Sequence, residues 1–262
     1  MRPHLNLGLP AAASAANFRW DGRIGERPAQ PATAFGNTRS VSDAELIARV
    51  RDIRDRLGTV GPSKLRSDGD FERVSIPQSD ADALRDLLIT VKATTVIEIG
   101  LAYASSALAI AEAILSQPGK DKAHLIIDPY QAEFHDAGWS ALSRAGLSEV
   151  CQLLRERSQL ALPRLVGEGF RADAAFVDGS HAFHNVFVDL FFLSELVRPD
   201  GLVVIDDYRW PSVATAVGYF EINTGWRQEP IHQDTRLRAY RLPNPPVDAS
   251  FETFVPFGID TK

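Results

Sequence analysis

The sequence predicts an α/β fold in which a mainly parallel β-sheet is covered by helices on both faces. Five short apolar runs alternate with segments of helical periodicity, which is typical of a doubly wound sheet. The runs are too continuously apolar for strands with one wet face, which indicates parallel strands buried on both sides. Two later runs are joined by only a short polar turn, which predicts a closing antiparallel hairpin. With 262 residues and 45% hydrophobic content, the chain is long enough for one such domain but not for two large ones.

The elements before the sheet are predicted from composition and capping signals. Residues 1–41 are rich in Ala, Pro, Gly and Asn without periodicity, and we expect an irregular arm. Ser42, with Glu45 three positions later, predicts a helix start, and the apolar period that follows ends at Gly58. A loop then leads to a second helix over 78–92.

The sheet domain is expected over residues 42–242. Its strands are predicted at 94–99, 123–128, 150–154, 173–177 and 202–206, and its hairpin strands at 226–231 and 237–242. Helices are predicted at 104–116, 137–146, 158–166, 183–196 and 211–222. The C-terminal tail, 243–262, carries prolines and three phenylalanines, and we expect it to pack on the domain or on a second subunit. The sequence therefore leaves open whether the chain forms a homo-oligomer.

Composition narrows the class of partner. The net charge is −6, the pI is near 5.5 and no basic run occurs, so neither a nucleic acid nor a membrane surface is an expected partner. The single cysteine, Cys151, lies in an apolar run and is expected to be a buried thiol of a cytoplasmic protein. Asn6, Gly8 and Pro10 interrupt the apolar opening, which disfavours a signal peptide.

Acidic residues follow the fourth and fifth predicted strands. Asp178 comes directly after the fourth strand with His181 three positions on, and Asp206 and Asp207 end the fifth. Parallel strands open their carboxyl ends onto one crevice, where converging acids are costly unless a cation neutralises them. Oxygen ligands suit Mg²⁺, and the histidine is placed to move a proton. An alternative set of Asp178, His181 and His184 would favour Zn²⁺ or Fe²⁺.

The turn after the first strand is a candidate ligand loop. Gly100 allows a backbone to approach a ligand closely, and the amides of the following helix start can meet an anion. Ala102 and Ser105 stand where a dinucleotide-binding loop has its second and third glycines, which weakens a nicotinamide-dependent oxidoreductase interpretation.

The run from Val96 to Ser106 and the Asp-x-x-His motif at Asp178 resemble class I S-adenosylmethionine-dependent methyltransferases, in particular the metal-dependent O-methyltransferases of the macrolide-sugar and catechol types. The resemblance covers about residues 78–242 and implies a Rossmann-like sheet of seven strands, the last inserted antiparallel. It implies Mg²⁺ at the three aspartates, His181 as the general base, and a cofactor site whose members are Glu98, Gly100 and Ser106 at the methionine end, Asp128 at the ribose, and Tyr130 and Ser158 beside the adenine.

The implied activity is Mg²⁺-assisted transfer of a methyl group from S-adenosylmethionine to a hydroxyl of a small molecule. A sugar in natural product biosynthesis is the first choice of acceptor and a phenol or catechol the second, because catechol-type members commonly carry Lys where this chain has His181. Two alternatives stay open: an NAD(P)-dependent oxidoreductase on the same sheet, and a non-catalytic module that keeps the fold.

Overall fold

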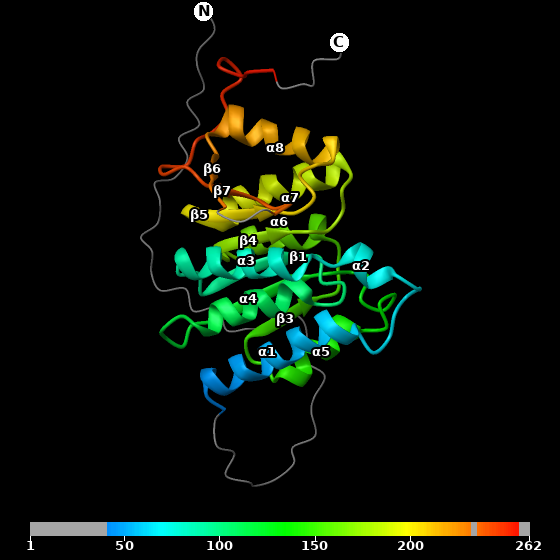
Figure 1. Cartoon of the computed structure of the whole chain (residues 1–262). Helices are drawn as coiled ribbons and strands as arrows, with labels where there is room; N and C mark the ends of the chain where they lie inside the picture. Colours follow the sequence, from blue (N-terminus) through cyan, green and yellow to red (C-terminus); the bar gives the residue numbers. More distant parts are fainter. Residues whose placement is uncertain (1–40, 232–234, 257–262) are drawn as a thin grey trace, which may run out of the picture. The chain divides into compact units, whose positions relative to one another are not determined.

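The structure is a computed structural model that describes residues 41–231 and 235–256. The chain forms two units, Met1–Thr38 and Arg39–Lys262, and every described residue belongs to the second. The predicted arm over 1–41 therefore lies outside the described residues, apart from Val41. Labels below follow Figure 1.

Seven strands form one sheet in the order β3-β2-β1-β4-β5-β7-β6. Strands β1 to β5 pair in parallel, and β7 pairs antiparallel with both β5 and β6. The bounds are β1 Thr95–Ile99, β2 Ala123–Ile127, β3 Cys151–Leu154, β4 Ala172–Val177, β5 Val197–Ile205, β6 Arg227–Glu229 and β7 Arg238–Arg241. The predicted doubly wound, Rossmann-like sheet with an antiparallel closing strand is confirmed.

The register aligns the carboxyl ends of the central strands. Ile99 of β1 pairs with Val177 of β4, and Val177 pairs with Ile205 of β5. The residues that follow these positions consequently leave the sheet side by side, and this shared edge is where the candidate site forms.

Eight helices are found in the described part of the chain, and seven of them pack in two groups (Figure 1). In one group α4 contacts α1, α3 and α5, and in the other α7 contacts α6 and α8. Right-handed crossovers place these groups on opposite faces of the sheet. The bounds are α1 Asp43–Val60, α2 Asp70–Val74, α3 Gln78–Thr90, α4 Ser105–Leu115, α5 Ala137–Ala145, α6 Ser158–Gly167, α7 Phe183–Leu196 and α8 Pro211–Thr224.

The first helix begins as predicted but ends later. Ser42 and Glu45 form a capping box at its start. The helix continues through Gly58 to Val60, and it ends at Gly61, whose positive φ of 79° suits glycine. The short helix α2 lies just after the predicted loop. It was not predicted, because its sequence is too short to show a helical period.

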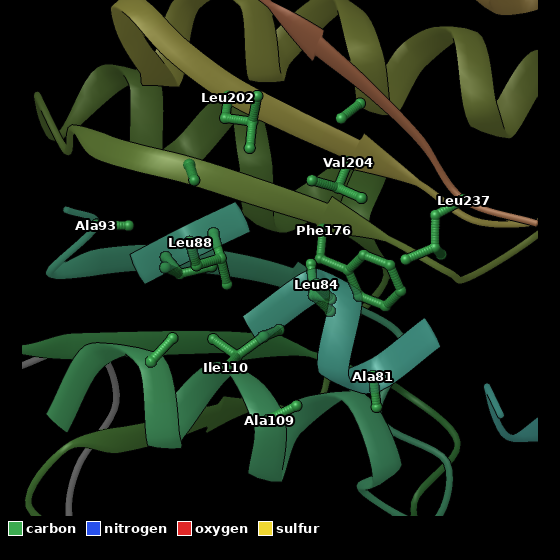
Figure 2. Close-up of a cluster of buried hydrophobic side chains, with 14 of the residues drawn as sticks. Ala81, Leu84, Leu88, Ala93, Ala109, Ile110, Phe176, Leu202, Val204 and Leu237 are labelled. Carbon is green, nitrogen blue, oxygen red and sulfur yellow. The ribbon is translucent and has the colours of Figure 1, made fainter. Parts of the chain in front are cut away.

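The main core lies between α3, α4 and one face of the sheet, as Figure 2 shows. Phe176 of β4 packs there with Leu84 and Leu88 of α3, Ile110 of α4, and Val204 of β5. Each of these side chains is at most 1% exposed, and burying one stabilises the fold by about 1.5–3 kcal/mol. A second cluster joins α1, α4, α5 and β2, and it includes the buried thiol of Cys151.

The described part of the C-terminal tail returns to α8. Asn223 and Val255 exchange two hydrogen bonds, of 2.8 and 3.0 Å, and the ring of Phe254 lies 6.3 Å from that of Tyr219. The tail thus packs on its own domain over this stretch. Among the described helices, none combines the length and the apolar character that a membrane crossing requires.

Candidate active site

A cavity of about 660 Å³ opens at the carboxyl ends of β1, β2, β4 and β5. Seven of the ten predicted site residues line it: Gly100, Asp128, Tyr130, Ser158, Asp178, His181 and Asp207. The remaining three, Glu98, Ser106 and Asp206, lie outside its described wall. Residues predicted for the cofactor and for the acceptor therefore share one cavity.

The β1–α4 loop is held against the end of β4. Gly100 has φ 96°, and a Cβ at this position would lie 2.2 Å from the carbonyl oxygen of Asp178. The glycine is therefore required by protein backbone, whereas the sequence suggested a ligand as the reason. Ala102 and Ala104 also adopt left-handed conformations, at φ 41° and 70°, in a turn where related loops use glycine.

The carboxylate of Asp128 fixes the same loop. Its Oδ2 accepts hydrogen bonds from the backbone N–H groups of Leu101 and Ala102, at 3.0 and 3.2 Å, and from Gln131 at 2.9 Å. Its Oδ1 accepts from the backbone of Tyr130 at 2.7 Å. A carboxylate offers about four acceptor sites, so most of its capacity is used within the protein. Binding of ribose by Asp128 stays a prediction.

Glu98 lies beneath the loop and is fully buried. Its Oε1 accepts a 2.5 Å hydrogen bond from Ser106, and its Oε2 lies 2.9 Å from Nε2 of His124. The other ring nitrogen of His124 is 3.7 Å from the sulfur of Cys151. The contact of His124 with Glu98 was not predicted, because the sequence of an apolar strand does not indicate which acid on a neighbouring strand its histidine will contact.

The two residues predicted beside the adenine differ in exposure. Tyr130 is 51% exposed at the cavity, whereas Ser158 is buried at the start of α6. A hydrogen bond links Ser158 to Asp189 of α7, which sequence reasoning missed because it reads as part of a helical face. Burial raises the pKa of Asp189 to about 7, and this outweighs the bond from Ser158.

Three predicted residues converge at the other end of the cavity. One donor atom each from Asp178, His181 and Asp207 lies within 4.8 Å of the other two. Nε2 of His181 is 3.1 Å from Oδ2 of Asp207 and 3.9 Å from Oδ1 of Asp178. We call these three residues the acidic cluster. His184 lines the same cavity but does not belong to the converging set within the described chain.

Local backbone positions the members of the acidic cluster. Asp207 adopts φ 54°, an uncommon conformation for a residue other than glycine, directly after β5. Its Oδ1 is buried and makes no hydrogen bond within the described structure, although Arg209 approaches to 3.4 Å. The carbonyl of His181 accepts a 2.6 Å hydrogen bond from Ser212 of α8.

Asp206 is not part of the acidic cluster in the described structure, and its role as a metal ligand stays a prediction. Both of its oxygens accept hydrogen bonds from Arg236, at 2.8 and 2.6 Å. Consecutive residues at a strand end face opposite sides, so only one of two adjacent acids faces a given site. Arg236 was not predicted, yet the antiparallel register Ile205↔Arg238 brings the start of β7 to this point.

Burial and charge shift the pKa values of Asp178, His181 and Asp206. Burial raises the pKa of Asp178, and His181 acts in the opposite direction. Burial also raises the pKa of Asp206, although Arg236 opposes it. The interaction with Asp178 and the charge of Asp207 raise the pKa of His181 above its ordinary value. The site therefore crowds negative charge where a cation or a proton would relieve it.

A family model described as a methyltransferase domain matches residues 97–208. The fold is similar to the O-methyltransferase from Bacillus cereus in complex with S-adenosylhomocysteine, at 13% identity and a TM-score of 0.51, over 77% of this chain and 92% of that one. It is also similar to the S-adenosylmethionine complex of TomG, an O-methyltransferase from Streptomyces achromogenes involved in tomaymycin synthesis, at 19% identity and a TM-score of 0.52, over 76% and 89%. No curated protein shows significant similarity to the sequence.

The family match and the sheet order agree with each other. At such identities the likeness to solved structures concerns the fold, and the match over 97–208 covers the ligand loop, Asp128, the acidic cluster and Asp206. The closing hairpin, with β7 between β5 and β6, departs from the all-parallel sheet expected of the oxidoreductase alternative. The chain thus combines a match to a methyltransferase-domain model over residues 97–208 with a fold similar to that of solved O-methyltransferases.

Proposed function

We propose that the protein transfers the methyl group of S-adenosylmethionine to a hydroxyl of a small molecule, with help from a divalent cation, Mg²⁺. The observation that carries this proposal is the convergence of Asp178, His181 and Asp207 on the cavity that the β1–α4 loop also lines. A hydroxyl is a poor nucleophile until it begins to lose its proton, so an O-methyltransferase needs a base beside its methyl donor.

His181 is the residue suited to take that proton. Its side chain is 43% exposed, so an acceptor in the cavity can reach it. Asp207, at 3.1 Å, orients the imidazole and stabilises the imidazolium that proton transfer creates. The backbone hydrogen bond from Ser212 fixes the segment from which His181 projects.

Asp178 and Asp207 are the residues that would hold the cation. Their oxygens lie close together, and the buried Oδ1 of Asp207 has no hydrogen bond within the described structure, so a ligand position is open there. A bound Mg²⁺ supplies Lewis acidity that lowers the pKa of an acceptor hydroxyl. We leave Asp206 out of this set of ligands, because both of its oxygens already accept hydrogen bonds from Arg236.

The cofactor would lie along the opposite part of the cavity. This part is lined by Gly100, Asp128, Tyr130 and Ser158. Asp128 lies at the end of β2, and its Oδ1, which accepts one hydrogen bond from Tyr130, would also accept from the cofactor. Glu98 would act from below, by holding Ser106 at the start of α4. We infer a natural-product sugar as the first choice of acceptor and a phenol or catechol as the second, because a sugar hydroxyl is less acidic and depends more on a base such as His181.

Calorimetry and a transfer assay test the proposal. S-adenosylhomocysteine should bind the purified protein, and NAD and NADP should not. Labelled S-adenosylmethionine should then methylate a member of a panel of glycosides and catechols, and a chelator should reduce turnover. Undiminished turnover in the chelator would refute the role of the cation, and binding of NAD alone would refute the methyltransferase.

A non-catalytic module remains the second candidate. It would bind S-adenosylhomocysteine through the same loop and leave cellular function unchanged in a His181→Ala variant. Loss of function in that variant, with S-adenosylhomocysteine binding retained, distinguishes the enzyme from the module.

A further inference from the structure

We propose that Arg236 is an internal counter-ion that keeps Asp206 from the divalent cation and thereby weakens cation binding by the acidic cluster. The inference rests on the proposed function, because the cation is part of that function. Arg236 lies just before β7, and it follows Asp206 by 30 residues in the sequence.

The contact between the two side chains is bidentate and buried. Nε and Nη2 of Arg236 donate to the two oxygens of Asp206 at 2.8 and 2.6 Å, and the side chain of Asp206 is 0% exposed. A planar guanidinium matches a carboxylate in this way, and the pair is stronger than a single charged hydrogen bond. A cation can coordinate Asp206 only if at least one of these hydrogen bonds breaks.

Arg236 is also anchored on its other side. Its backbone N–H donates to Asp80 of α3 at 3.3 Å, and its Nε lies 3.9 Å from the same carboxylate. Asp80 is 3% exposed. The arginine is thus held between two buried acids before any ligand arrives, so its position is part of the fold.

The charge that remains matches one divalent cation. With Asp206 neutralised by Arg236, Asp178 and Asp207 are the acids left in the acidic cluster, and neither has a bidentate partner among the described residues. Two carboxylates carry the charge that one Mg²⁺ neutralises. A third carboxylate would raise the affinity of the site, and Arg236 withholds it.

Arg236 has space into which it can move. It lines the main cavity and also a second cavity of about 310 Å³ between α1, α2 and the start of α3. Its side chain is 23% exposed. Release of Asp206 therefore needs no displacement of the core, and the pair can in principle open without unfolding.

Titration with Mn²⁺, followed by electron paramagnetic resonance of the free ion without any acceptor, tests the inference. Asp206→Asn should leave the affinity within about twofold of the wild type, since Arg236 already withholds this acid, whereas Arg236→Met should tighten binding by about tenfold or more. The double variant should return to the wild-type affinity, which gives a coupling in a double-mutant cycle. Arg241→Met is the matched control, because Arg241 pairs with Glu229 away from the acidic cluster, and it should change nothing.

Two results would overturn the inference. One is a loss of about tenfold or more in Mn²⁺ affinity for Asp206→Asn, which would make Asp206 a ligand in the wild type. The other is an unchanged affinity in folded Arg236→Met, including the case in which neither protein binds Mn²⁺. Arg236→Met leaves a buried acid unpaired, so circular dichroism must show that it folds, and Asp206→Asn alone decides if it does not.

The same samples separate this inference from the proposed function. S-adenosylhomocysteine binding and methyl transfer by the wild type address the proposed function. If both are present and the cation affinities do not respond to Arg236, only the inference fails.

Discussion

The two halves of the cavity treat their acids differently. In the β1–β2 half, Asp128 accepts four hydrogen bonds from the protein and Glu98 is fully buried beneath the loop. In the β4–β5 half, Asp207 keeps a buried oxygen without a hydrogen bond, and the pKa of Asp178 is raised. In the first half the carboxylate of Asp128 holds a loop in shape, whereas in the second half Asp178 and Asp207 gather their charge around His181, an arrangement typical of reactive sites.

The largest expected effect belongs to the β4–β5 half. His181→Ala should lower turnover by about 10²–10⁴-fold, because the substitution removes the proposed general base. S-adenosylhomocysteine affinity, measured by calorimetry, should not change. His184→Ala is the control, since His184 lines the same cavity outside the acidic cluster, and an equal loss there would contradict the assignment.

Gly100→Ala should disrupt the contact between the β1–α4 loop and the end of β4, which joins the two halves of the cavity. Its Cβ would lie 2.2 Å from the carbonyl oxygen of Asp178 at φ 96°, so we expect a loss of about 3 kcal/mol or more in the free energy of unfolding. Gly169→Ala isolates the conformational part, because Gly169 has φ 73° with no atom within 4 Å of its Cβ. Denaturant unfolding should show a cost of about 1 kcal/mol for that control. Equal costs would mean that the loop can move aside.

Asp189→Asn should make stability less dependent on pH. The folded-state pKa of Asp189, about 7, lies above its unfolded value, so the folded state binds the proton more tightly. Its contribution to stability is then full below about pH 4 and is lost as the pH rises towards 7, a difference of about 4 kcal/mol at most. The unpaired amide of Asn costs about 1–3 kcal/mol, so the variant should be about 1–2 kcal/mol more stable than the wild type at pH 8 only.

Asp173 provides the opposite control for that pH series. It is partly buried, yet hydrogen bonds from Thr94, Thr95 and Arg198 lower its pKa. Asp173→Asn should therefore destabilise the protein at pH 8 and matter less at low pH. A pH-independent effect of both substitutions would contradict the two assignments.

A direct comparison of the two halves sets Asp128→Asn against Asp207→Asn. Asp128→Asn replaces a carboxylate oxygen that accepts from backbone N–H groups, so we expect a loss of about 1–3 kcal/mol in unfolding free energy and weaker S-adenosylhomocysteine binding. Asp207→Asn should leave stability unchanged or higher, because it relieves crowded charge, while turnover falls. If both variants lost stability equally, the two halves would not differ as described.

Much of the fold could be predicted because apolar runs mark strands that are buried on both faces. Phe176 and Val204 lie in such runs, and both reach the core of Figure 2. Helix ends were less predictable: Gly58 was predicted to end the first helix, but the residue with a positive φ at its end is Gly61.

The candidate site was predictable only in part. The strand ends gave Asp178, His181 and Asp207, because position along the chain determines which side chains meet at one edge of the sheet. The division of labour between Asp206 and Asp207 depends on which side of β5 each faces, and the partner of Asp206 comes from another strand. His124 and Asp189 depend equally on neighbours distant in sequence.

The contact between Gly100 and the backbone of Asp178 has a further consequence. Because no side chain separates the loop from the end of β4, the loop lies as close to that strand as two backbones allow. The N–H of Asp178 donates to the carbonyl of Ile99 at 2.9 Å, which locks the two segments together. The spacing between the loop proposed for the cofactor and the strand end proposed for the acceptor is thus set by two backbone segments in direct contact. In the proposed methyl transfer, whose rate would depend on the distance between the reacting groups, we expect substitutions at the surface to leave this spacing unchanged.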